Sequence, residues 1–199
     1  MYNVTMDSVI ILGHTRQPTK MIPENNKNNH PIVVGNTVGI HNGTITNDGE
    51  IFLSLDRREE RSRKRIGSVD SEAIFSLIDE VAPDQPLKEY TLEVKEKATL
   101  LVGSYTTLSF NRNFPQRLLL LKYDKPISVH YSPDLTSLFF SSRYVFLRKS
   151  FGKSVITEAL QSKKGYIFEV NFLLDLKKTP VAQFDLEELK VVHWYTDNS

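Results

Sequence analysis

Three short segments hold side chains that could bind and polarise a small polar molecule. They are residues 13–19 (GHTRQPT), 41–47 (HNGTITN) and 68–72 (SVDSE). In the first, Arg16 follows a strand end, where a guanidinium can bind a carboxylate through two parallel hydrogen bonds. In the second, Asn-Gly predicts a tight turn that places the Asn42 amide beside the Gly43 N–H as an oxyanion hole. In the third, the Asp70 carboxylate at a helix start could hold an ammonium group.

Together the three segments describe a pocket for a free α-amino acid with a side-chain amide. Each segment alone has a simpler interpretation: a strand-end salt bridge, a hairpin turn and a helix cap. Short motif matches often arise by chance, so these interpretations stay open for each segment taken singly.

The elements that must position these residues are helices grouped together and strands in meanders. Asp70 predicts a helix N-cap, followed by apolar residues at helical spacing up to Val81, and Pro83 ends this helix. A second helix is expected over 87–97. We expect strands over 8–12, 32–40, 99–110, 116–122, 126–131, 137–141, 165–170, 181–184 and 189–194, a loop over 17–31 and a short helix over 142–149. This order favours an α+β layered sandwich over a doubly wound parallel sheet.

Length and composition exclude several classes of protein. The chain of 199 residues predicts one domain, 1–199, and a net charge of +1 argues against a dedicated nucleic-acid or membrane-surface binder. The mixed-charge segment 56–65 is expected to be a solvated helix end and loop, with a phosphate-binding patch as the alternative. No apolar run could span a bilayer and no signal peptide is evident, so we expect a cytoplasmic protein.

The sequence contains no cysteine, which excludes disulfides, thiolate zinc sites and a cysteine nucleophile from these residues. The five histidines show no metal-ligand spacing, so no metal is expected, and no cofactor is implied.

In order and spacing, the motifs resemble the glutaminase domain of class II glutamine amidotransferases, which are Ntn hydrolases. The shared features are G-H-T-R-x-x-T, the asparagine-rich run that ends in His30-Pro31, H-N-G-x-I-x-N and V-D-S-E. Later segments at 101–105, 139–143 and 165–170 extend the resemblance over about residues 8–170. The Asn-Asn-His-Pro variant resembles small stand-alone members from phages and bacteria, for which the location would be the host cytoplasm.

The resemblance implies a four-layer αββα sandwich and hydrolysis of glutamine to glutamate and ammonia. By motif, Arg16 with Thr19 would bind the glutamine α-carboxylate, and Asp70 would bind its α-ammonium. Asn42 and the Gly43 N–H would form the oxyanion hole, and His41 would be structural.

One departure from the family concerns the nucleophile, which is an N-terminal cysteine in a segment that precedes G-H-T-R. Here G-H-T-R begins at residue 13, so we expect an N-terminally truncated domain that is inactive alone. It would be a fragment whose cysteine comes from another piece, a degenerate paralogue, or a mis-started sequence. The alternative is a non-catalytic interaction or structural protein that reuses the fold.

The expected ligand is glutamine or glutamate, with no nucleic acid or membrane partner. Loss of the first strands would leave an uncovered sheet edge. We therefore expect an N-terminal fragment, a synthase partner chain or a second copy at that edge.

Overall fold

Two antiparallel sheets lie face to face in the computed structural model, which describes residues 10–15, 28–56, 65, 67, 69–152, 158–170, 180–187 and 192–194. The larger sheet has the strand order β1-β2-β3-β4-β8-β9-β10 and the smaller has β6-β5-β7. The strands are β1 (Ile32–Val34), β2 (Thr37–Ile45), β3 (Gly103–Asn111), β4 (Phe114–Tyr123), β5 (Ser128–Ser132), β6 (Ser137–Ser141), β7 (Glu158–Ala159), β8 (Lys164–Glu169), β9 (Ala182–Asp185) and β10 (Val192–Trp194).

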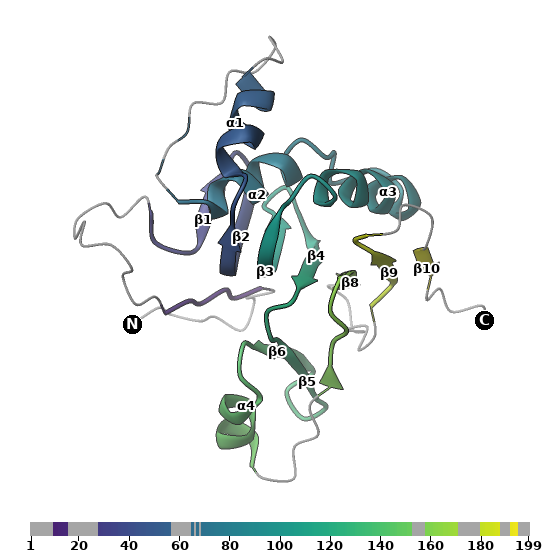
Figure 1. Cartoon of the computed structure of the whole chain (residues 1–199). Coiled ribbons are helices and arrows are strands. Elements are labelled where there is room, and N and C mark those ends of the chain that lie inside the picture. The colour runs from purple at the N-terminus through teal and green to yellow at the C-terminus, as the bar shows by residue number, and fades with distance from the viewer. Residues whose placement is uncertain are drawn as a thin grey trace.

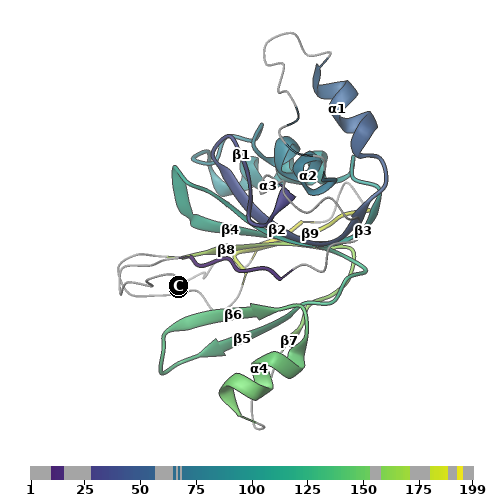
Figure 2. The same ribbon diagram turned by 90° about the vertical axis from the view of Figure 1, so that its left-hand side faces the viewer.

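Helices cover the outer faces of this pair of sheets. The helices are α1 (Asp48–Asp56), α2 (Ser71–Ile78), α3 (Leu87–Ala98) and α4 (Tyr144–Phe151). Figure 2 shows α1, α2 and α3 on one side of the larger sheet, and α4 beyond the smaller sheet. The described part of the chain therefore has the expected helix–sheet–sheet–helix layers, also visible in Figure 1.

The two faces of the larger sheet bury different sets of side chains. On the helix side, α2 packs on β2 so closely that a Cβ on Gly39 would lie 2.2 Å from the Phe75 ring. On the other side, Leu108, Leu120 and Tyr166 form a second core with Ile10 and Leu12. Residues of β2 alternate between these faces, since side chains of a strand point to opposite sides in turn.

The sequence predicts α2, α3 and the β3–β6 meander with small shifts of their ends. Asp70 is the N-cap of α2, and its carboxylate accepts the Ser71 N–H at 3.0 Å. The helix ends at Ile78 rather than Val81. Its C-cap residue Asp79 accepts hydrogen bonds from the Asn36 N–H and from the N–H and hydroxyl of Thr37.

Three expectations about the first half of the chain are wrong. The strand expected over 32–40 is two strands, which turn at Gly35 and Asn36 with a left-handed Gly35 (φ +57°). Asn42 and Gly43 lie inside β2 rather than on a turn, because the nine residues of β2 pair in unbroken register with β3. Within the expected strand 8–12, described residues 10–12 are in no strand, although their burial alternates.

Two short elements are absent from the sequence-based expectations. Ile51, Phe52 and Leu55 are buried on one side of α1, and their helical spacing could have indicated it. The two-residue strand β7 is too short to give a pattern. Most of the loop expected over 17–31 lies outside the described residues, as does most of the mixed-charge segment 56–65.

We predict that Gly39→Ala destabilises the protein by about 1–3 kcal/mol, because the added methyl would overlap the buried Phe75 ring. Gly49→Ala in α1 is the matched control. Its Cβ would meet nothing within 4 Å, and alanine favours a helix over glycine by up to about 1 kcal/mol. Urea denaturation measures both. Equal stability of Gly39→Ala and the unaltered chain would contradict the close packing of α2 on β2.

Candidate functional site

The described parts of the motif segments meet at the start of α2. The Ser71 hydroxyl lies 2.8 Å from His41 Nδ1 and 3.1 Å from His30 Nε2. The His14 ring lies 4.3 Å from the His30 ring, measured between centroids. Three segments that are far apart in the sequence, those that contain His14, His41 and Ser71, therefore come together in the fold.

Strand alternation places Asn42 on the face between the two sheets. His41 and Gly39 face α2, whereas Ile40 packs against the inter-sheet core. Asn42 follows the alternation of Ile40 and is half-buried, so its amide lies on the inter-sheet side near the end of β2. An oxyanion hole needs such a donor, held in place and partly shielded from water.

Gly43 is in a conformation that favours glycine. Its φ is +137°, and a Cβ there would lie 2.1 Å from the carbonyl oxygen of Ser104 on β3. Gly103, at the facing end of β3, has the same relation to the Thr44 carbonyl oxygen. The two glycines let the backbones of β2 and β3 approach closely beside the candidate donors.

Asp70 fixes the end of β2 as well as the start of α2. Its Oδ2 accepts the Ile45 N–H at 2.6 Å, while Oδ1 accepts the Ser71 N–H. Each carboxylate oxygen has a second lone pair, so the group keeps capacity for a ligand ammonium. The helix-cap interpretation is therefore correct for Asp70, and it does not conflict with a binding role.

Arg16 and Thr19 lie outside the described residues. Chain connectivity alone relates Arg16 to the site, because described residues His14 and Thr15 precede it directly. Of the predicted site residues, the structure thus places Asn42, Gly43 and Asp70 within one short stretch of β2 and the start of α2.

Ser71 and the rings of His14 and His30 are not among the site residues predicted from the sequence. The register between β1 and β2 brings His30 close to His41, and no sequence spacing shows that register. Among the described residues, no group of three or more histidine, aspartate or glutamate side chains is arranged to hold a metal ion.

A row of directly paired residues runs from Asn42 across the larger sheet through Thr106, Lys122 and Lys164 to Asp185. Directly paired residues of antiparallel strands point to the same face, so this row places Lys122 on the Asn42 side. Lys122 is buried, and burial lowers the pKa of its ammonium.

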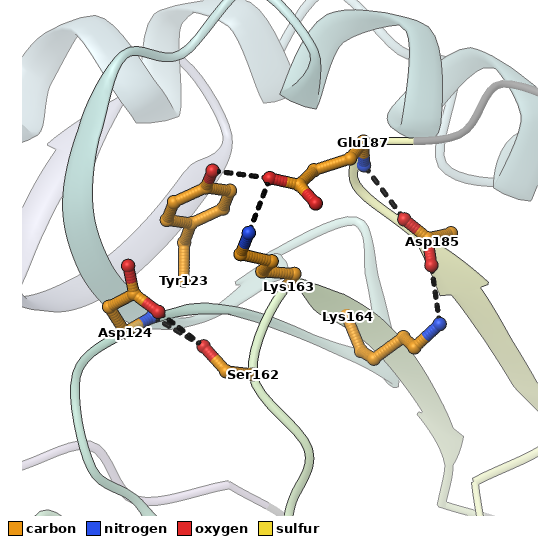
Figure 3. Close-up of polar contacts among 7 residues, drawn as sticks. All are labelled: Tyr123, Asp124, Ser162, Lys163, Lys164, Asp185 and Glu187. Atoms are coloured by element: carbon orange, nitrogen blue, oxygen red, sulfur yellow. Dashed lines mark hydrogen bonds and ion pairs between the residues drawn. The ribbon is translucent and has the colours of Figure 1, made fainter.

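The far end of the row joins a network of paired charges at the ends of β4, β8 and β9 (Figure 3). The Tyr123 hydroxyl and the Lys163 ammonium both contact Glu187 Oε1, at 2.7 and 2.8 Å. Hydrogen bonds from Lys163 and Tyr123 lower the pKa of Glu187. Opposite charges satisfy one another here, so we interpret the network as structural.

The mixed-charge segment is described only at its two ends, Asp56 and Arg65. The Arg65 guanidinium pairs with Asp48 at 2.8 Å and lies 4.9 Å from the centre of the Phe52 ring. The Arg65 side chain therefore binds to two residues of α1, Asp48 and Phe52. In addition, no helix within the described ranges is long and apolar enough to cross a membrane.

The chain is similar in sequence to enzymes named glutamine–fructose-6-phosphate aminotransferase. The isomerizing glutamine–fructose-6-phosphate aminotransferase of Corynebacterium glutamicum is 30% identical over 125 residues, which are 62% of this chain and 19% of that enzyme. The enzyme of the same name from Pyrococcus horikoshii is 28% identical over 89% of this chain and 32% of its own length. The chain thus spans about a fifth to a third of these relatives. No family model matches.

Solved structures show the same fold. Glutamine phosphoribosylpyrophosphate amidotransferase from B. subtilis aligns with a TM-score of 0.58 at 16% identity, over 82% of this chain and 35% of that one. A glutamine aminotransferase class-II domain protein from Silicibacter pomeroyi gives 0.57 at 14% identity, over 81% and 72%. The chain therefore shares the fold of these two proteins.

We predict that acid destabilises the protein through His41. Burial lowers the pKa of His41 to about 4 in the folded state, a decrease that Asp70 opposes and His14 reinforces. The unfolded state therefore binds a proton from about pH 6.5 downwards, whereas the folded state binds it only near pH 4. The contribution of neutral, buried His41 to the free energy of unfolding is complete above about pH 6.5. It decreases by about 3 kcal/mol as the pH falls from about 6.5 to about 4.

The measurement is the free energy of unfolding against pH for the unaltered chain and for His41→Asn. The difference between the two curves isolates His41 from Asp70, His14 and His30, which also face this region. Curves that stay parallel between about pH 6.5 and 4 would show that His41 does not titrate as described.

Proposed function

We propose that this chain is a glutamine-binding domain of the class II amidotransferase type. The observation that supports it most strongly is the meeting of the described motif segments at Ser71 beside Asn42, Gly43 and Asp70. Sequence similarity to glutamine–fructose-6-phosphate aminotransferases and a shared fold with amidotransferases point to the same ligand.

In this proposal each predicted residue has one task. Arg16, with Thr19, binds the α-carboxylate of glutamine, and Asp70 binds the α-ammonium through its remaining lone pairs. The Asn42 amide and the Gly43 N–H polarise the side-chain carbonyl and stabilise the oxyanion that forms when a nucleophile attacks it.

A cysteine nucleophile is not among these 199 residues, which contain no cysteine. A thiolate for amide hydrolysis must therefore come from polypeptide outside them, either more of the same protein or another chain. A partner chain or a second copy could add strands at β6, which among the described strands pairs with β5 alone. We propose that the chain alone binds glutamine without hydrolysing it.

A non-catalytic interaction protein is the second candidate. Tyr144, Val145 and Phe146 on α4 are exposed, and a surface of this kind is suited to protein contacts. On this alternative, Arg16, Asn42 and Asp70 have only structural roles.

We predict that L-glutamine and L-glutamate raise the melting temperature. A ligand that binds only the folded state at about 100 times its Kd adds about 2.7 kcal/mol of stability, which is several degrees for a chain of this size. Arg16→Ala and Asn42→Ala should each remove most of the shift. The exposed residues Arg143 and Asn113 provide matched controls, since Arg143→Ala and Asn113→Ala should retain it.

D-glutamine and D-glutamate test whether the rise in melting temperature depends on the configuration at the α-carbon, whose carboxylate and ammonium groups Arg16 and Asp70 would bind. No response to either L-amino acid, together with recovery of a defined partner in pull-downs, would favour the interaction protein instead.

We also predict that the 199-residue chain releases no ammonia from glutamine above the buffer rate. A coupled glutamate dehydrogenase assay measures this directly. Ammonia release that Asn42→Ala abolishes would contradict the proposal that the nucleophile lies outside these residues.

A further inference from the structure

The Ser71 side chain contacts two histidines, His41 and His30, which belong to two other motif segments. The residue is 2% exposed, and its hydroxyl lies within hydrogen-bond distance of His41 on β2 and of His30 just before β1. We call Ser71, His41 and His30 the Ser71 junction.

A serine hydroxyl has a single proton, which restricts the junction. Ser71 can donate to one imidazole only, and it must then accept from the other. The tautomers of the two rings are therefore linked: when one of the two ring nitrogens accepts the hydroxyl proton, the other must donate to the hydroxyl oxygen. Burial lowers the pKa of His41 and so keeps it neutral at neutral pH, in agreement with this arrangement.

The junction also determines where the candidate donors lie. Asn42 and Gly43 sit between His41, which bonds to Ser71, and Ile45, whose N–H bonds to Asp70. Glycine is the most permissive backbone position, so the direction of the Gly43 N–H depends on what fixes the chain on either side. In addition to the pairing of β2 with β3, which holds Asn42 and Gly43 opposite Thr106 and Tyr105, two contacts with the N-cap and the first residue of α2 hold the chain on either side.

The second contact of Ser71, with His30, leads to a residue of the first motif segment, His14. His30 lies between Ser71 and the His14 ring, whose centroid is 4.3 Å from that of His30. Arg16 is two residues beyond His14 in the chain. His30 therefore links Ser71 to His14, a described residue of the first motif.

We propose that Ser71 is the positioning residue of the glutamine site: through His41 it helps to fix Asn42 and Gly43, and through His30 it contacts the part of the chain that packs against His14. This inference rests on the proposed function for its ligand. The arrangement of the junction itself is independent of any ligand.

The test compares Ser71→Ala with Ser71→Thr, which keeps the hydroxyl, and with Ser76→Ala as the matched control. Ser76 lies on the same helix, is 1% exposed and is outside the junction. Calorimetry with L-glutamate measures affinity. Imidazole ¹⁵N spectra and the amide signals of Asn42 and Gly43 report the junction without ligand.

We expect Ser71→Ala to weaken L-glutamate binding about tenfold or more, since small misplacements of site residues have effects of at least this size. It should also shift the Asn42 and Gly43 amide signals and change the imidazole ¹⁵N shifts of His41 and His30. Ser71→Thr should restore both readouts, and Ser76→Ala should change neither.

The outcomes separate the two proposals. If the unaltered chain binds no L-glutamate, the proposed function fails, and the imidazole and amide signals still decide whether Ser71 positions this segment. If Ser71→Ala leaves affinity and signals unchanged, the positioning role is wrong. If Ser71→Ala does not fold, spectra of the unaltered chain decide: imidazole ¹⁵N shifts that show both His41 Nδ1 and His30 Nε2 without a proton would overturn the proposal, because one hydroxyl proton cannot bond to both.

Discussion

The contacts between the start of α2 and the end of β2 are the constraint on which the candidate site depends. Asp70 caps the helix and at the same time accepts the Ile45 N–H, and Ser71 bonds to His41, the residue directly before Asn42. One helix start thus fixes β2 on both sides of Asn42 and Gly43. A glycine inside a strand has little conformational preference of its own, so its position depends on these contacts together with the pairing of Gly43 with Tyr105 on β3.

The far end of α2 is attached to the same strand. Asp79 accepts hydrogen bonds from Asn36 and Thr37, so the helix is held to the beginning of β2 as well as to its end. Between these ends, Gly39 allows the Phe75 ring to pack directly on the strand. Because α2 and β2 are joined along their whole length, a change at either one should be transmitted to the candidate donors.

Much of the fold can be predicted from the sequence because its signals are local. The N-cap Asp70, the apolar spacing of α2 and the alternating strands of the meander each act within a few residues. The turn expected at Asn42 and Gly43 is wrong because the same dipeptide also suits a strand that approaches its neighbour closely. The pairing of β2 with β3 decides between the two, and that pairing joins residues far apart in the chain. In the candidate site, likewise, Asn42, Gly43 and Asp70 follow from motifs, whereas the contacts of Ser71 with His41 and His30 depend on strand register and on the position of α2.

The most direct test of the central claim is an ¹H–¹⁵N NMR titration of the chain with L-glutamate. If glutamate binds at the end of β2, saturable shifts should be largest at the Asn42 side-chain amide and at the backbone N–H groups of Gly43 and Ile45. The absence of saturable shifts, or shifts confined to a distant element such as α4, would contradict an amino-acid site where the end of β2 meets the start of α2.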